Sequence, residues 1–320
     1  MNNNQPNKGV IHLMTATMHQ PSRKRPASTT RMLKALAFLT PAALMILVFV
    51  FYPVIRTVQL GFQNFNLFDQ LNVGYNGLAN FRSVVEDPNF SRIMKNTFLW
   101  VFVSVFFQFT IGFGLALLMK TKFKFIGIYQ GLIFIPWALS GFLMGLVWKW
   151  IFDESFGVLN DALLKLGIVD TRIPWLSDAR WGMAAVIIAN VWYGVTFFVI
   201  MILAALQGVP KEMLEAAELD GANRFQTLFS VIIPYIRATL ILIVLLRIMW
   251  ITNFPDLIFG MTSGGPAGQT HIISSWLIEK LTLDANWGQA SALGLMTMVV
   301  LFVFTLFYLM ATRLEKDSGV

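Results

Sequence analysis

Cysteine is absent from the sequence, and histidine occurs only three times in 320 residues. The absence of cysteine excludes disulfides, thiolate nucleophiles and thiolate metal ligands together. His12 and His19 lie in a polar N-terminal stretch, and His271 lies far from both along the chain. A metal site built from several histidines is therefore not expected.

Charged side chains are also scarce. Asp, Glu, Lys and Arg make up 13% of the residues, about half of the roughly 25% usual in soluble domains, and 56% of the residues are hydrophobic. A soluble protein with so much apolar surface would aggregate, so the composition indicates a membrane protein. The formal net charge of +7 is explained by membrane topology, because basic residues gather on the cytoplasmic side. Nucleic-acid binding is not expected.

Six apolar stretches are each about 20 residues long, which is the length a helix needs to cross the hydrocarbon core. They are residues 33–55, 97–118, 126–150, 183–206, 231–252 and 291–312. The sequence therefore predicts an all-α membrane protein with six transmembrane helices in one domain, residues 32–314. No tandem repeat or large additional domain is visible in the sequence.

Basic residues determine the predicted orientation. They cluster at residues 23–34 and 120–124, next to the ends of predicted spans, and such clusters stay in the cytoplasm. Both termini are then cytoplasmic. Residues 1–31 are polar with a basic patch and are predicted to be disordered, and residues 315–320 form a short tail. A signal peptide is the alternative for the N-terminal end, but the first apolar stretch is longer than a usual signal sequence and favours an uncleaved span.

The cytoplasmic loop 207–234, between the fourth and fifth spans, predicts two helices. Pro210 suits the start of the first helix, and Lys211–Leu219 is rich in strong helix formers. Gly221 permits a sharp break before a second helical stretch at residues 225–233.

The first of these helices has the properties of a docking element. It places three small or apolar residues on one side and three acidic residues around them: Met213, Ala216 and Ala217, with Glu215, Glu218 and Asp220 as the rim. Such a face fits a groove on a second protein. An ordinary solvated helix between two spans is the alternative.

This loop resembles the EAA loop of bacterial ABC importer permeases. The family's pattern is Glu-Ala-Ala, three residues, Gly, nine residues, and then Ile-x-Leu-Pro. The matching residues are Glu215-Ala216-Ala217, Gly221 and Pro234, with Val231 and Ile233 as apolar replacements. The resemblance covers residues 33–314 and implies the type I importer permease fold.

Two further segments resemble the carbohydrate branch of that family, the maltose and glycerol-phosphate type. They are Asp220-Gly221-Ala222 and, after the fifth span, Thr262-Ser263-Gly264-Gly265-Pro266 followed by Thr270. The resemblance implies that Thr262, Gly264, Gly265 and Pro266 form a turn at the periplasmic gate. A flexible turn without that role is the alternative.

The chain has no Gly-x-x-x-x-Gly-Lys-Ser/Thr segment, so ATP chemistry must belong to another chain. The resemblance implies a second, different permease, two ATPase subunits that hold ATP and Mg, and a periplasmic or lipid-anchored substrate-binding protein. This chain is then a transport subunit of the bacterial inner membrane, with no catalytic residues and no cofactor of its own. Closure of the ATPases is expected to turn an inward-facing cavity outward.

Polar and aromatic residues in the fourth and fifth spans are the candidates for the substrate path, because polar groups within a membrane are costly. They are Asn190, Trp192, Tyr193, Arg247, Trp250 and Asn253. Sugar sites use aromatic faces and hydrogen-bonding groups, and helix packing is the alternative for each residue. Arg247 either faces the cargo or pairs with a carboxylate, such as Asp256 or one on a partner. A cargo-facing Arg247 would favour an acidic sugar, such as a uronate or alginate-type oligosaccharide.

Other functions remain as alternatives. Within the importer class, the cargo is alternatively glycerol-phosphate, a polyol or a neutral sugar. A secondary transporter or channel is a more distant alternative, and so is an integral membrane enzyme. The spans carry no central carboxylates for ion coupling and no clustered catalytic groups, and neither class explains the pattern of loop 207–234.

Overall fold

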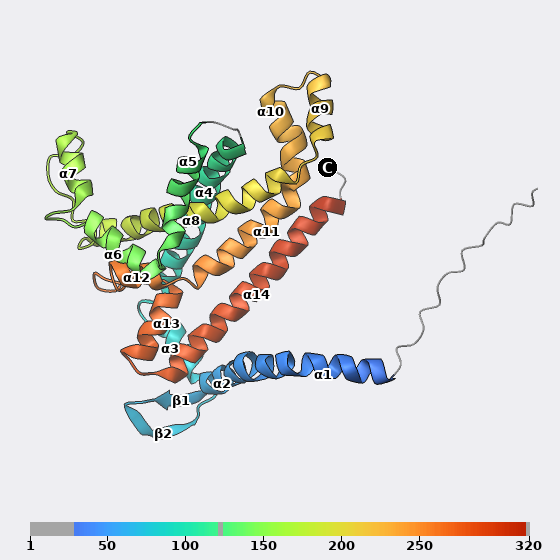
Figure 1. Cartoon of the computed structure of the whole chain (residues 1–320). Coiled ribbons are helices and arrows are strands. Elements are labelled where there is room, and N and C mark those ends of the chain that lie inside the picture. Colours follow the sequence, from blue (N-terminus) through green and yellow to red (C-terminus); the bar gives the residue numbers. More distant parts are fainter. Residues whose placement is uncertain (1–28, 121–123, 318–320) are drawn as a thin grey trace, which may run out of the picture. The chain divides into compact units, whose positions relative to one another are not determined.

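The computed structural model describes residues 29–120 and 124–317, most of which are helical (Figure 1). The chain divides into two compact units, Met1–Pro53 and Val54–Val320, where the sequence indicated one membrane domain. Of the predicted disordered tail, residues 1–28 lie outside the described residues, and residues 29–31 begin the first helix. Residues 318–320 also lie outside them.

The first unit is helical. α1 (Thr29–Ile46) contains Pro41 and is followed by a π-helical turn, η1 (Leu47–Phe51), and by the start of α2 (Tyr52–Gly61). Apolar side chains such as Phe38 and Phe49 are largely exposed along it. A helix with an apolar surface is suited to lipid or to another protein chain, not to water.

The described residues contain five helices that are long and apolar enough to cross a membrane, and six if a bent pair of helices is counted as one span. The five are Leu36–Gly61, Phe90–Lys120 (α4), Ala179–Gln207 (α8), Arg224–Thr252 and Trp287–Thr312. The fourth of these combines α10 (Arg224–Gln226), the π-helical turn η3 (Thr227–Ile232) and α11 (Ile233–Thr252), and the fifth belongs to α14 (Trp287–Asp317). The predicted helical fold is confirmed.

The third span, predicted for residues 126–150, is not one continuous helix. α5 (Ile126–Phe134) passes into the short 3-10 helix η2 (Ile135–Ala138), and α6 (Gly141–Ile151) continues at an angle of 104°. Pro136 lacks a backbone donor, and Ser140 caps α6 by accepting a hydrogen bond from the N–H of Leu143 at 3.3 Å. These two residues together end one helix and start another.

The outer segments contain elements that the sequence analysis did not predict. β1 (Gln63–Asn66) and β2 (Asp69–Tyr75) form an antiparallel hairpin, and α3 (Ala79–Glu86) follows it. Asn80 fastens α3 to the hairpin, because its side chain donates to the carbonyl of Gln63 at 2.8 Å. The remaining short helices are α7 (Val158–Lys165), α12 (Asp256–Met261) and α13 (Ile273–Thr282).

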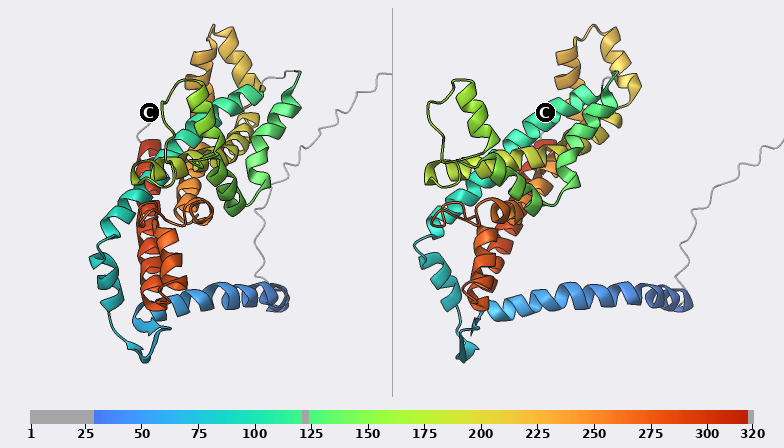
Figure 2. Two further views of the ribbon diagram at one scale, coloured as in Figure 1. Left: turned by 90° about the vertical axis from the view of Figure 1, so that its left-hand side faces the viewer. Right: turned by 60° about the vertical axis from the view of Figure 1, so that its left-hand side comes forward.

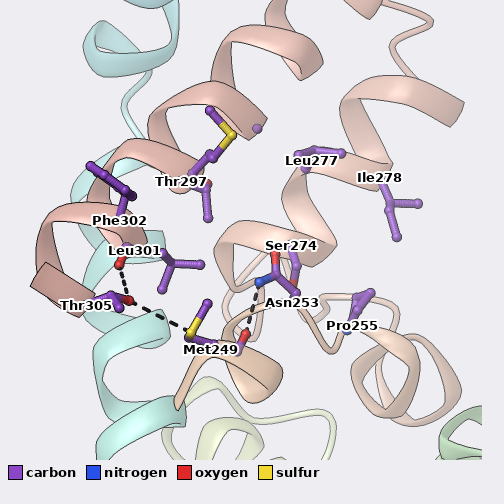
Figure 3. A pocket seen from close by; sticks show the side chains of 12 residues that line it. Met249, Asn253, Pro255, Ser274, Leu277, Ile278, Thr297, Leu301, Phe302 and Thr305 are labelled. Carbon is purple, nitrogen blue, oxygen red and sulfur yellow. Dashed lines mark hydrogen bonds between the residues drawn. The ribbon is translucent and has the colours of Figure 1, made fainter. Parts of the chain in front are cut away.

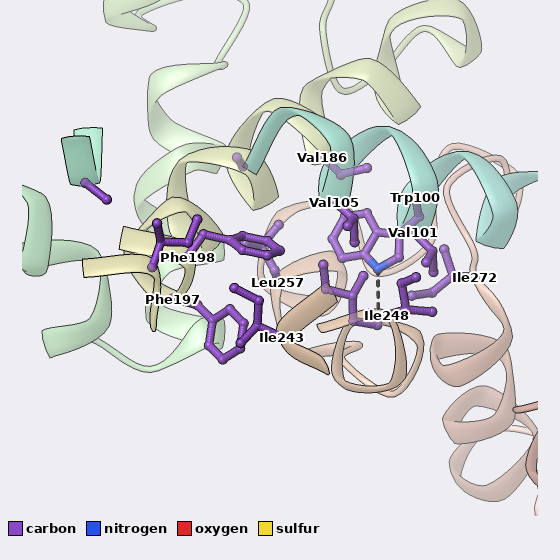
Figure 4. Close-up of a cluster of buried hydrophobic side chains, with 14 of the residues drawn as sticks. Trp100, Val101, Val105, Val186, Phe197, Phe198, Ile243, Ile248, Leu257 and Ile272 are labelled. Atoms are coloured by element: carbon purple, nitrogen blue, oxygen red, sulfur yellow. Dashed lines mark hydrogen bonds between the residues drawn. The ribbon is translucent and has the colours of Figure 1, made fainter. Parts of the chain in front are cut away.

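The core of the second unit lies where α4, α8 and α11 pack together (Figure 4). Trp100 of α4, Phe198 of α8 and Ile243 of α11 are fully or almost fully buried there. The Trp100 indole also donates to the carbonyl of Ile251 at 3.1 Å, which joins α4 to α11.

The second unit has two distinct ends (Figures 1 and 2). α9 (Lys211–Leu219) and α10 lie at one end, the hairpin lies at the other, and α14 extends between them. A unit that spans a membrane requires this separation, because its cytoplasmic loop and its outer segments must lie on opposite sides.

Candidate functional site

The cytoplasmic loop folds into the two helical pieces that its sequence predicts. α9 follows Pro210 and ends before Gly221, whose φ of +78° is a left-handed conformation suited to glycine. The N–H of Ala222 donates to the carbonyl of Ala217 at 2.9 Å and closes the end of α9. The second piece contains η3 directly before Pro234, where the proline cannot supply the N–H of a regular α-helical ladder.

The exposed face of α9 differs from the predicted one at two residues, Ala217 and Leu219. Ala217 is buried against its own chain, beside Leu214, which packs against the core. Its expected grouping with Met213 and Ala216 is therefore wrong. The apolar residues that remain exposed are Met213, Ala216 and Leu219, and the side chain of Leu219 is 90% exposed. Glu215, Glu218 and Asp220 are exposed around them.

Arg247 lies inside the protein and joins three helices. Its side chain is 2% exposed, and its Nε donates to Oε1 of Gln108 on α4 at 2.8 Å. Gln108 Nε2 in turn donates to the carbonyl of Asn190 on α8 at 2.8 Å. Gly194 leaves space for this arrangement, because a Cβ there would overlap both the guanidinium and the Gln108 amide. Sequence reasoning missed Gln108, whose only signal was its position as an amide in an apolar span.

The charge of Arg247 is not neutralised by a carboxylate within the described residues. The alternative that paired it with Asp256 is therefore wrong. The guanidinium carbon instead lies 5.4 Å from the centre of the Phe197 ring and 5.7 Å from that of the Trp250 ring. Aromatic faces stabilise a buried cation through the ring quadrupole. Arg247 and Trp250, two of the predicted substrate-path residues, therefore lie next to each other.

Aromatic residues gather at the bend of the third span. The Trp137 ring centre lies 6.0 Å from that of Trp250 and 6.2 Å from that of Phe197. Tyr193 stacks on Phe254 at 5.4 Å, and Trp192 lies edge-on to Trp148. Trp137 at the bend therefore lies next to Trp250, one of the predicted substrate-path residues. The sequence analysis did not include Trp137 among these residues.

The other two predicted path residues lie in different surroundings. Asn190 is fully buried, and its side-chain nitrogen and oxygen have no hydrogen-bond partner among the described residues. Asn253 is exposed and lies in a separate half-open groove of about 490 Å³ between α11, α13 and α14 (Figure 3). Its amide donates to the carbonyl of Met249 at 3.0 Å. The six predicted residues therefore do not form one continuous surface.

Thr262, Gly264, Gly265 and Pro266 lie in the non-helical connection between α12 and α13, as a turn requires. The peptide bond between Gly265 and Pro266 is cis. The side-chain oxygen of Thr262 lies 2.7 Å from that of Thr270, so the two threonines close the turn across its base.

Comparisons with known proteins identify a family of membrane transport components and similar permeases. Residues 108–317 match the family described as binding-protein-dependent transport system inner membrane component. The sulfoquinovosyl glycerol transport system permease protein of Agrobacterium fabrum is 30% identical, over 89% of this chain and 92% of the relative. The trehalose/maltose transport system permease protein of Thermococcus litoralis is 30% identical, over 87% of this chain and 92% of the relative.

A solved structure is similar along most of the chain. It is a bacterial alginate ABC transporter in complex with an alginate pentasaccharide-bound periplasmic protein. One of its chains is 26% identical with a TM-score of 0.77, and the match covers 91% of this chain and 98% of that chain.

Proposed function

The chain belongs to the family of binding-protein-dependent transport system inner membrane components, and we propose that its cargo is a carbohydrate of the oligosaccharide class. A member of this family is a multi-pass transport subunit of an ATP-driven importer, and the ATPase is a separate chain. The observation that carries the proposed cargo is the likeness to the alginate transporter over 91% of this chain. The sugars in the names of the Agrobacterium and Thermococcus relatives support a carbohydrate cargo.

An acidic oligosaccharide is the cargo that we test first. Arg247 carries a positive charge that no carboxylate of the described residues neutralises, in a part of the chain expected to exclude water. Coulomb attraction is stronger at every distance where the dielectric constant is low, so a carboxylate on the cargo is attracted without direct contact. Direct contact with Arg247 would require the guanidinium to leave Gln108, because its side chain is buried as it stands.

The partners follow from the family. A substrate-binding protein is the proposed source of the cargo, since the family's description calls the transport system binding-protein-dependent. We further propose a second, different permease subunit, and two ATPase subunits that hold ATP and Mg. The exposed apolar surface of the first unit, with Phe38 and Phe49, is consistent with contact to lipid or to the second permease.

α9 is the proposed contact with the ATPase. Met213, Ala216 and Leu219 are exposed apolar residues on one side of a short helix at the cytoplasmic end, and acidic residues that include Glu212 lie among and around them. A helix of this kind binds in a groove through its apolar residues, while the acidic rim fixes its orientation. Gly221 ends the helix, and the loop then leads directly into the fifth span, so force on α9 reaches Arg224–Thr252.

The experiment is transport by the complete complex in proteoliposomes, with the permeases, the ATPase and the delivery protein. We expect uptake of an alginate-type oligosaccharide that requires ATP inside the vesicle and the delivery protein outside it. A neutral oligosaccharide of equal length is the matched control for charge. Uptake driven by an ion gradient without ATP would contradict the proposal and favour a secondary transporter.

A further inference from the structure

The segment that connects α12 to α13, residues 262–272, is called the outer turn here, and it is closed by its own hydrogen bonds. The Thr270 hydroxyl donates to the carbonyl of Gly265 at 2.8 Å and lies 2.7 Å from the Thr262 hydroxyl. The Thr270 N–H donates to the carbonyl of Gly264 at 3.0 Å. Thr270 is fully buried, and its hydroxyl and N–H are both hydrogen-bonded within the turn, as buried polar groups usually are.

The outer end of α4 binds this turn from one side. Asn96 is 7% exposed, and its side-chain N–H groups donate to the carbonyls of Gln269 at 2.7 Å and His271 at 3.1 Å. The Thr97 hydroxyl, one residue later, accepts the N–H of Ile273 at 2.9 Å. More than 170 residues separate these partners along the chain. Both Asn96 donors are therefore used on backbone of the outer turn.

His271 binds the turn from the side of α13. Its Nδ1 lies 3.1 Å from the Ser275 hydroxyl, and its Nε2 lies 2.5 Å from a carboxylate oxygen of Glu279. The imidazole also rests on Gly264, where a Cβ would overlap the ring. Gly264 has a φ of +85°, so glycine is required there both by its backbone conformation and by the histidine above it.

We propose that Asn96, Thr270 and His271 are positioning residues for transport. Thr270 holds the outer turn closed, and Asn96 and His271 fix the closed turn to α4 and α13 so that the three move together. α12 precedes the turn and packs on α6, the second half of the bent span. The bonds of Asn96 and His271 therefore link the outer end of α4 to that bend. When the outer side opens and closes, the bent span follows α4 through this linkage. The inference rests on the proposed function, because it assigns these residues a part in alternating access.

The test uses isosteric substitutions in the complete complex. Thr270→Val removes the hydroxyl and keeps the shape, whereas Thr270→Ser keeps the hydroxyl and is the rescue variant. Asn96→Asp removes both N–H donors and places a carboxylate against two carbonyls. Thr110→Val is the matched control, because the exposed Thr110 hydroxyl donates only within its own helix, to Phe106. The readout is the number of sugar molecules taken up per ATP hydrolysed.

We expect Thr270→Val and Asn96→Asp to lower this ratio about tenfold, which corresponds to one or two ordinary hydrogen bonds lost in the coupled motion. Thr270→Ser and Thr110→Val should keep the wild-type ratio. Assembly and ATP hydrolysis without the delivery protein check that each variant folds. If Asn96→Asp fails to assemble, the uptake ratios of Thr270→Val and Thr270→Ser test the positioning role.

Two outcomes overturn the inference in distinguishable ways. A wild-type ratio for Thr270→Val, in a complex that transports normally, overturns the positioning role and leaves the proposed function intact. A wild-type complex with no ATP-dependent uptake overturns the proposed function and this inference together.

Discussion

A guanidinium inside a membrane needs partners, and Arg247 has an amide and two aromatic rings in place of a carboxylate. Gln108→Leu removes the acceptor of the Arg247 Nε, and a hydrogen bond to a charged group is worth about 1.5–3 kcal/mol. We expect a lower thermal midpoint for the variant in detergent. Because Arg247→Met removes the other partner, the double variant should lose less than the sum of the single losses. Strictly additive losses would show that the two side chains do not interact.

Gly194 offers a second prediction at this scale. Alanine is favoured over glycine within a helix by about 1 kcal/mol, so a free site gains stability from the change. Gly114→Ala should be neutral or stabilising, since nothing lies within 4 Å of a Cβ there. Gly194→Ala should be destabilising, because the Cβ would overlap Arg247 and Gln108. Equal thermal midpoints for the two variants would contradict the close approach.

We expect the stability of the folded protein to depend on pH through His271. Burial lowers the pKa of His271, the nearby Glu279 opposes this, and Arg92 adds to the lowering. The folded protein thus favours the neutral imidazole, whereas the unfolded chain binds a proton below about pH 6.5. Stability should therefore be full above that pH and decrease as the pH falls below it. His271→Gln keeps an N–H near Glu279 and cannot titrate, so its thermal midpoint should change less between pH 7.5 and 5.5 than that of the wild type.

At the scale of elements, α9 has an inner and an outer side that the sequence pattern did not separate. Ala217→Leu adds volume where the helix packs on its own chain, and overpacking costs about 1–3 kcal/mol. Ala216→Leu adds the same volume on the exposed side. We expect only the Ala217 variant to have a lower thermal midpoint. The reverse order would contradict the assignment of the two sides.

The spans show which elements a sequence can predict. Long uniform apolar stretches identified α4, α8, α11 and α14, because length and hydropathy suffice for a membrane span. The bend at Pro136 and Ser140 was not predicted, because both halves are equally apolar and a proline is compatible with a merely kinked helix. The β hairpin was missed although Leu71, Val73 and Tyr75 alternate with other residues along β2. The Asn and Gly residues among them are equally typical of a loop, and the strands are short.

At the scale of the whole molecule, the function could be predicted from a short motif within one loop. The contacts of the candidate site join residues that are far apart in the sequence, so no short motif could predict them. Gly221 and Pro234 lie in the same loop, so their spacing can be recognised from the sequence alone. Gln108 and Arg247 are 139 positions apart, and Asn96 and His271 are 175 apart. Only the packing of α4 against α8, α11 and the outer turn brings these pairs together.

The central claim is that α9 couples this permease to an ATPase through an exposed apolar face. Its most direct test is sugar uptake by the reconstituted complex with Ala216→Arg, compared with Ala179→Arg, an exposed alanine at the start of α8. We predict that Ala216→Arg abolishes stimulation of ATP hydrolysis by the loaded delivery protein and reduces uptake at least tenfold. The six spans should stay folded, and Ala179→Arg should behave as the wild type. Normal uptake and normal stimulation with Ala216→Arg would contradict the account.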